Sequence, residues 1–305
     1  MYELIIIGGG PAGITAGIYA ARKKIKTLIL SKDFVGQAGK ANIIENWPGI
    51  KTIAGPELLS QFMSHLDEFD IEKKEGYLVS ILEKRNDVFY LTTDMGEVFE
   101  SKAVIVATGR NPRPLKVPGE KEYLGKGISY CAVCDAPMFA KKKVAVVGGG
   151  NSGFETAIEM ATKHLAKVFL LEVVSKPIAD ESLQEEVKNN NNIEVITGAL
   201  LKEIKGKTFV ESVVYTDKNT KEDKELEVQG VFVEIGSVPA VDFLKDLATC
   251  NEVGEIEIDH NSCQTKTDGL FAAGDVTNIK GKQVVIAAGE GSKAALSVYS
   301  YLRKL

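Results

Sequence analysis

Two cysteines separated by two residues carry the clearest chemistry in this sequence. Cys131 and Cys134 enclose Ala132 and Val133, and Asp135 follows directly. Two thiols at this spacing can close a small disulfide and reopen it, so the pair can store two electrons in a reversible covalent bond. The sequence therefore predicts a redox-active dithiol with an acid beside it.

Zinc binding and a purely structural disulfide are the weaker interpretations of this pair. Tetrahedral zinc needs two further ligands, but Cys250 and Cys263 are isolated and the chain has three histidines in all. A disulfide that closes so short a loop removes little entropy from the unfolded chain, and four cysteines with one such pair fit a reducing compartment. We therefore predict no metal site.

The composition indicates a globular protein with two domains. The chain has 305 residues, of which 44% are hydrophobic and 26% are charged, and this length can supply two separate cores. A net charge of -5 argues against a nucleic-acid partner and against docking on an anionic membrane. The first predicted strand begins at about Tyr2, which leaves no room for a signal peptide, so we expect a cytoplasmic protein.

A glycine-rich turn follows that first strand. The apolar run Tyr2–Ile7 leads into Gly8, Gly10 and Gly13, and the residues after Gly13 have the apolar spacing of a packed helix. In a GxGxxG turn the first glycine makes the tight turn, the second lets the backbone approach a pyrophosphate, and the third lets helix and strand pack closely. The helix N-terminus then presents free N–H groups to the phosphates. This pattern predicts a dinucleotide site.

The same plan begins again in the middle of the chain. Residues 143–147 form a second apolar run, residues 148–153 a second glycine turn, and a helix is expected from Phe154 to about Lys163. Each copy continues with a second strand, antiparallel hairpins and a buried strand that ends in glycine. Two matching turns in two matching layouts predict two bound dinucleotides.

The tail of the chain is expected to rejoin the first copy. It contains a predicted strand at 255–259, a strand at 269–275 that ends in Gly-Asp, and a long helix at 284–302, but no glycine fingerprint of its own. Prolines at 112–118 and at 239 mark the crossings between the copies. We predict an α/β fold of two Rossmann-like three-layer domains, the second inserted into the first, with domains at 1–112 plus 241–305 and at 113–240.

The order of these motifs resembles that of the bacterial low-molecular-weight thioredoxin reductases over essentially the whole chain. The motifs that carry the resemblance are Gly8–Gly13, Glu45–Gly49, Ala107–Arg110, Tyr130–Asp135 and Ala272–Asp275. From Gly148 onward the chain is also similar to the reductase half of the alkyl hydroperoxide reductase flavoprotein, which carries an additional dithiol domain ahead of this core. Because our first strand starts at about Tyr2, we expect the electron acceptor to be a separate protein.

The resemblance implies an FAD domain made of both chain ends, an inserted NAD(P)H domain, and a homodimer. It implies that Cys134 faces the flavin, that Cys131 attacks the partner disulfide, and that Asp135 is the acid–base group. Ala136 and Pro137 depart from the glycine that this family has after the acid. The residues assigned to FAD are Gly8, Gly10, Pro11, Ala12, Gly13, Ser31, Gly36, Gln37, Asn46, Thr108, Gly109, Gly274, Asp275, Gln283 and Val284. Those assigned to the nicotinamide nucleotide are Gly148, Gly150, Asn151, Ser152, Gly153, Glu172 and Gly236.

The residues that follow the second strand of each copy bear on which ribose is bound. The first copy has Ser31 and Lys32 where an acid would hold the adenosine ribose, so that contact is unassigned. The second copy has Glu172 where NADPH-dependent thioredoxin reductases carry an arginine-rich run. A carboxylate there accepts hydrogen bonds from an unmodified ribose and repels a 2′-phosphate. We therefore predict NADH over NADPH, without excluding NADPH.

The predicted reaction passes electrons from NADH through FAD and the Cys131–Cys134 dithiol to thioredoxin or a small glutaredoxin-like protein. One dithiol cannot lie at the flavin and at a protein surface together, so the inserted domain is expected to rotate about the proline-bearing crossings. The alternatives are a ferredoxin-dependent thioredoxin reductase, a flavin NADH oxidase or hydroperoxide reductase component, and a redox sensor that holds FAD without turnover.

Overall fold

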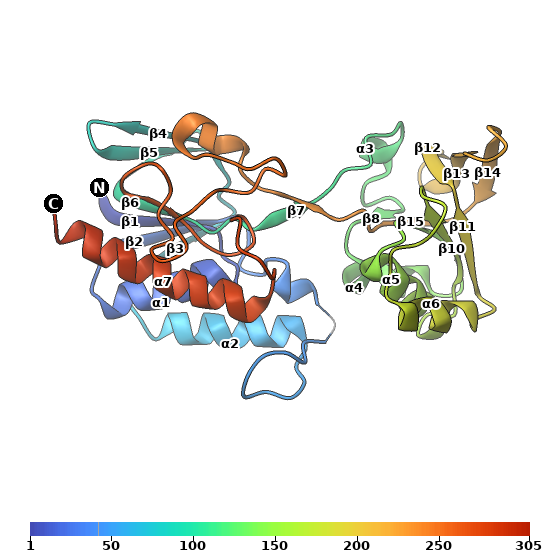
Figure 1. Ribbon diagram of the computed structural model, residues 1–305, viewed down its shortest axis with the longest axis horizontal. Coiled ribbons are helices and arrows are strands. Elements are labelled where there is room, and N and C mark those ends of the chain that lie inside the picture. The colour runs from blue at the N-terminus through green and yellow to red at the C-terminus, as the bar shows by residue number, and fades with distance from the viewer. Residues whose placement is uncertain (42) are drawn as a thin grey trace. The chain divides into compact units, whose positions relative to one another are not determined.

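The chain forms two compact units, one inserted in the other (Figure 1). This computed structural model describes residues 1–41 and 43–305, apart from the side chain of Val133. The first unit combines residues 1–111 with 238–305, and the second comprises residues 112–237. At the two crossings, strands β7 (Arg110–Pro112) and β16 (Ser237–Pro239) pair as a two-stranded sheet. The predicted rotation about these crossings stays a prediction.

The first unit is built on a seven-stranded sheet in the order β3-β2-β1-β6-β5-β4, with β17 also paired to β6. Its apolar strands are buried because they pair in parallel at the centre of the sheet. The strands are β1 (Tyr2–Ile7), β2 (Thr27–Ser31), β3 (Glu72–Glu75), β4 (Val79–Arg85), β5 (Val88–Thr93), β6 (Val98–Val106) and β17 (Leu270–Ala272).

Three helices of the first unit lie on one face of this sheet (Figure 1). They are α1 (Pro11–Arg22), α2 (Gly55–Asp67) and α7 (Val284–Leu302). Small residues let α1 and α7 approach closely, since a Cβ on Gly291 would lie 2.0 Å from the carbonyl oxygen of Ala12. The C-terminal helix therefore packs directly against the helix that follows the first glycine turn.

The second unit is built on a parallel sheet in the order β11-β10-β9-β15-β8. Residues that alternate along its strands enter two different cores: Val146 and Phe232 pack with the helices, and Val147 and Val231 pack with a three-stranded antiparallel sheet. The parallel strands are β8 (Ile128–Ser129), β9 (Lys143–Val147), β10 (Lys167–Glu172), β11 (Ile193–Thr197) and β15 (Gly230–Val233). The antiparallel strands are β12 (Ala199–Gly206), β13 (Val210–Asp217) and β14 (Asp223–Glu227), and the helices are α3 (Glu120–Tyr123), α4 (Ala132–Asp135), α5 (Asn151–Thr162) and α6 (Glu181–Lys188).

The prediction of two Rossmann-like α/β domains is confirmed, because each unit has a parallel strand, a glycine turn and a helix in that order. The strand predicted at 255–259 is wrong. Only Ile256 makes isolated bridges there, to Cys250 and to Thr277. In the first unit, the last strand of the predicted hairpin layer continues without a break into the predicted buried strand. Together they form β6, which pairs antiparallel with β5 and parallel with β1.

No helix in the described part of the chain has both the length and the apolar character needed to cross a bilayer.

The close packing of α1 and α7 generates a prediction. We expect Gly291→Ala to lower the free energy of unfolding by roughly 1–3 kcal/mol, because its Cβ would overlap the carbonyl of Ala12. Gly289→Ala on the same helix is the matched control: nothing lies within 4 Å of its Cβ position, so improved helix propensity should raise stability by up to about 1 kcal/mol. Denaturant unfolding of both variants decides, and equal stabilities would contradict the packing.

Candidate functional site

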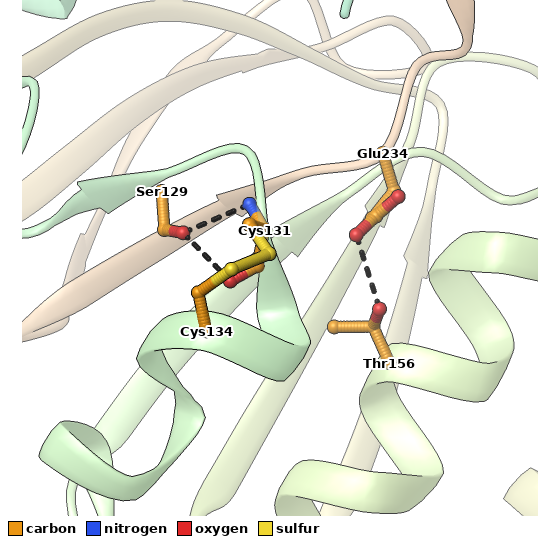
Figure 2. The surroundings of a disulfide bond; sticks show 5 residues. All are labelled: Ser129, Cys131, Cys134, Thr156 and Glu234. Carbon is orange, nitrogen blue, oxygen red and sulfur yellow. Dashed lines mark hydrogen bonds between the residues drawn. A yellow bond between two sulfur atoms is a disulfide. The ribbon is translucent and has the colours of Figure 1, made fainter. Parts of the chain in front are cut away.

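Cys131 and Cys134 are joined by a disulfide in the second unit (Figure 2), with their Cα atoms 5.3 Å apart. The hydroxyl of Ser129, at the end of β8, bonds to both backbone polar groups of Cys131. This hydroxyl donates to the Cys131 carbonyl at 3.1 Å and accepts from the Cys131 N–H at 3.0 Å. The short helix α4 begins at the next residue, and the Cys134 N–H donates to the Cys131 carbonyl at 3.2 Å. These hydrogen bonds position the backbone of the two disulfide-bonded cysteines directly after β8.

The two cysteines differ in exposure within the unit. Cys134 is exposed, whereas Cys131 and Asp135 are half-buried. Asp135 follows Cys134 in the same helical turn, and its N–H also donates to the Cys131 carbonyl. The structure thus brings the three predicted catalytic residues into one short segment, and their individual roles stay predictions.

A buried carboxylate that the sequence did not single out supports this segment. Glu120 accepts the hydroxyl of Tyr130, the residue before Cys131, and the backbone N–H groups of Leu115 and Lys116. Burial would raise the pKa of Glu120, but these hydrogen bonds outweigh it and lower the pKa. Glu120 therefore carries a charge that connects the loop after β7 to Tyr130, which precedes the CxxC pair.

The first glycine turn is closely packed at its first and third glycines and open at its second. A Cβ on Gly13 would lie 1.9 Å from the Gly8 carbonyl oxygen, so only glycine allows this helix to start so close to β1. Gly8 has a φ of 115°, which favours glycine. In contrast, no atom of the described residues lies within 4 Å of a Cβ built on Gly10. The turn is therefore closely packed at Gly8 and Gly13 and open at Gly10, where phosphates would bind at the start of α1.

The second glycine turn repeats this geometry closely. A Cβ on Gly153 would lie 1.9 Å from the Gly148 carbonyl oxygen, whereas a Cβ on Gly150 would have no atom within 4 Å in the part of the chain that the structure describes. Gly148 has a φ of 124°. The residues that precede the two helices also have nearly equal backbone angles: φ is −83° and ψ is −174° at Gly10, and φ is −88° and ψ is −179° at Gly150. Two separate open turns fit the two predicted dinucleotides.

Residues predicted to bind FAD gather around the first turn. Gly36 packs against it, since a Cβ on Gly36 would lie 3.1 Å from the Gly10 Cα. A Cβ on Gly274 would lie 3.0 Å from that of Ala12, so the end of β17 meets the start of α1. Ser31 is buried at the end of β2, and its hydroxyl donates to the Asp33 carbonyl. Pro11 is the first residue of α1, where its fixed φ suits the helix start.

The remaining predicted FAD residues connect this region to the loops around it. Gln37 donates to the Arg110 carbonyl at 3.0 Å, and Thr108 donates to the Ala240 carbonyl at 2.8 Å. Gly109 has a φ of 64° with open space at its Cβ position. Asn46 donates to the side chain of Gln283 at 2.9 Å. A cavity of about 420 Å³ opens beside this last pair, and its lining is Ala41, Ile43, Ile44, Glu45, Asn46, Gln283 and Val284.

Asp275 follows β17 and lies in an electrostatic setting that the sequence did not reveal. Burial raises the pKa of Asp275, and the charges of Lys282 and Arg110 oppose that rise. Both cations are held by Glu255, whose carboxylate lies 3.1 Å from Lys282 Nζ and 2.9 Å from Arg110 Nη1. The half-buried Asp275 thus has a carboxyl suited to hydrogen bonding with a polar ligand.

Glu172 occupies the position expected of a ribose-binding acid. It is buried at the end of β10, and its carboxylate accepts the N–H of Gly149 in the second turn and the N–H of Val174 at 2.9 Å. These bonds hold the carboxylate beside the turn. At the corresponding place in the first unit, Ser31 Oγ lies 2.9 Å from the Cβ position of Gly9. At this strand end the first unit therefore has a hydroxyl and the second unit a carboxylate.

The other residues predicted to bind the nicotinamide nucleotide differ in exposure and in hydrogen bonding. Asn151 is engaged with Asp180: its amide donates to that carboxylate at 2.8 Å and accepts the Asp180 N–H at 2.8 Å. Ser152 is exposed at the start of α5, and Gly236 has a φ of 84° with open space at its Cβ position. Asp180 was missed because its pairing joins residues 29 apart in the chain.

The chain belongs to the pyridine nucleotide-disulphide oxidoreductase family, whose pattern matches residues 2–291. Membership implies FAD and NAD(P)H as cofactors. The observations that support it are two open glycine turns and a disulfide that closes a CxxC pair.

Two relatives align in sequence with nearly all of this chain. The chain is 41% identical over 303 residues to an alkyl hydroperoxide reductase component of Staphylococcus aureus (strain MRSA252), covering 99% of this chain and 59% of that protein. It is 42% identical over 303 residues to a protein named NADH dehydrogenase of Bacillus subtilis (strain 168), covering 99% of this chain and 58% of that protein. The chain thus spans less than two thirds of the length of these relatives.

The fold of the chain matches the crystal structure of Lactococcus lactis thioredoxin reductase with a TM-score of 0.89, at 36% identity and with all of both chains covered. The predicted resemblance to thioredoxin reductases is confirmed.

The open front of the first turn generates a second prediction. We expect Gly10→Val to fold, because its side chain would enter open space, but to purify without flavin absorbance because that space is where the pyrophosphate would lie. Gly13→Ala is the contrasting variant and should fold poorly, since its Cβ would overlap the Gly8 carbonyl. Circular dichroism and the flavin spectrum measure the two properties separately. A Gly10→Val protein with full flavin content would refute the FAD assignment.

Proposed function

We propose that the protein is an FAD-dependent disulfide reductase that uses NADH and delivers electrons through the Cys131–Cys134 pair to a thioredoxin or a small glutaredoxin-like protein. The observation that carries the proposal is the closed CxxC disulfide in the same unit as the second glycine turn. FAD, when bound, accepts a hydride from the reduced nicotinamide and supplies two electrons to a disulfide. Residues around the first turn, with Asp275, would hold it.

The dithiol carries out the exchange with the partner protein. The Cys131 thiolate attacks one sulfur of the partner disulfide and forms a mixed disulfide. The Cys134 thiolate then attacks Cys131, which releases the partner as a dithiol and restores the Cys131–Cys134 bond. Two electrons and two protons pass to the partner. Asp135, half-buried beside Cys134, would hold and return a proton during these steps.

The preference for NADH follows from Glu172. Backbone N–H groups of Gly149 and Val174 hold its carboxylate at the turn, where it would accept hydrogen bonds from the ribose hydroxyls. A 2′-phosphate there would meet a fixed negative charge, and two unit charges about 4 Å apart repel by on the order of 4 kcal/mol at an effective dielectric of 20. The nearest cationic residue in sequence, Lys176, is exposed.

A second acceptor is favoured by the sequence relatives. The similarity to the staphylococcal alkyl hydroperoxide reductase component supports a role as the reductase component of a peroxide-reducing system, in which a small dithiol protein carries the electrons onward. Ferredoxin as the donor is the weaker alternative, because the second turn keeps the open geometry of a nucleotide site.

Replacement of a cysteine tests the proposed function. We expect Cys134→Ser to retain FAD and its reduction by NADH but to lose disulfide reductase activity by about a thousandfold or more, because the second exchange step has no thiolate. Turnover with purified thioredoxins and glutaredoxin-like proteins is the measurement. Cys250→Ser is the control, since Cys250 lies in the first unit, and it should keep full activity. Activity retained in Cys134→Ser would sink the proposal.

The carboxylate of Glu172 generates a prediction about cofactor choice. We expect Glu172→Gln to lower the ratio of kcat/KM for NADH over that for NADPH by roughly tenfold or more, because it removes the charge that repels the 2′-phosphate. Glu181→Gln, an exposed acid at the start of α6, should leave the ratio unchanged. A wild-type enzyme that clearly prefers NADPH would show the assignment of Glu172 to be wrong.

A further inference from the structure

Glu234 is a partly buried acid beside the second glycine turn that the proposed function leaves unused. It follows β15 directly, and its backbone N–H donates to the Val147 carbonyl at the end of β9 at 2.8 Å. Its own carbonyl oxygen lies 2.2 Å from the point that a Cβ on Gly148 would occupy. The residue is therefore packed against the start of the turn.

The side chain of Glu234 lies along the start of α5. Thr156, a buried residue of that helix, donates its hydroxyl to Glu234 Oε1 at 3.1 Å (Figure 2). A Cβ on Gly153 would lie 3.7 Å from the Glu234 Cβ. The carboxyl group thus lies beside the first two turns of α5, the helix whose N-terminal N–H groups would receive the pyrophosphate.

The surroundings make this carboxyl sensitive to pH near neutrality. Burial raises the pKa of Glu234 to about 7, while the Thr156 hydroxyl opposes the rise and the negative charge of Glu155 adds to it. Glu155 is the charged neighbour on α5, and the residues that face Glu234 from the end of β9 and the turn, Val147 to Gly150, have no titratable side chain. On its other side β15 pairs with β8, and the cysteines that follow β8, Cys131 and Cys134, are joined in a disulfide and carry no charge (Figure 2). Glu234 therefore changes charge in the range where the protein would work.

The geometry points to Glu234 as a residue that couples dinucleotide binding at the second turn to the uptake of one proton from solvent, an inference that rests on the proposed function. The neutral carboxyl places no charge beside the incoming pyrophosphate. The carboxylate adds a negative charge that opposes it. Binding favours the protonated form, and affinity falls as pH rises and the group ionises.

Calorimetric titration of the holoenzyme with ADP-ribose tests this coupling, because ADP-ribose has the adenosine and pyrophosphate but no nicotinamide to react. Titrations at about pH 7 in two buffers of different ionisation enthalpy report the protons taken up on binding. We expect net proton uptake, and an affinity roughly threefold to tenfold weaker at about pH 8 than at about pH 6. Glu234→Gln should show neither effect.

Two further variants separate the coupling from general damage. Glu155→Gln is the matched control on the exposed face of α5 and should retain proton uptake. Thr156→Val removes a donor that favours the charged form, so the pH midpoint of the affinity should move upward. Binding of ADP-ribose without proton uptake, or unchanged uptake in Glu234→Gln, would overturn the inference and leave the proposed function standing. If neither ADP-ribose nor NADH binds the wild-type protein at any pH, the proposed function fails together with the inference.

Discussion

The contact on which both units depend is the close approach of a helix to the strand before it at the third glycine of each turn. At Gly13 and at Gly153 the space for a side chain is taken by the carbonyl oxygen of the first glycine, 1.9 Å from the Cβ position in both cases. This packing brings the first helical N–H groups to the carboxyl end of the central strand. The middle glycine faces space that no described atom fills, which is the arrangement that the proposed dinucleotide sites require.

The two turns share this shape and differ in the charges placed around it. The first turn has the neutral Ser31 beside it. Asp275 follows Gly274, which packs against Ala12, and the positive charges of Lys282 and Arg110 act on its carboxyl group. Around the second turn the structure places carboxylates: Glu172 bonded to Gly149, and Glu234 against Gly148. One backbone motif, used twice, is therefore surrounded by different side chains at the strand ends, and the proposal of two different nucleotides rests on that difference.

The sequence predicted well whatever depends on local pattern. The strands and glycine turns of both units, and the helix at Val284–Leu302, have the expected places because apolar runs and glycine spacing determine them. The segment at 255–259 alternates like a strand, but Glu255 turns its carboxylate to Arg110, Lys282 and Asn251, and only Ile256 forms bridges. Glu120, Asp180 and Glu234 could not be found from the sequence, since their importance comes from partners that the fold brings together.

In the proposed electron path, the Cys131–Cys134 pair receives electrons from a nicotinamide nucleotide by way of a flavin. Anaerobic titration of the protein with NADH, followed by flavin absorbance and by counting of reactive thiols, tests this most directly. We expect uptake of about two equivalents of NADH per flavin, one for the flavin and one for the disulfide, with the appearance of about two new thiols. Complete flavin reduction by a single equivalent, with Cys131 and Cys134 still joined, would contradict it.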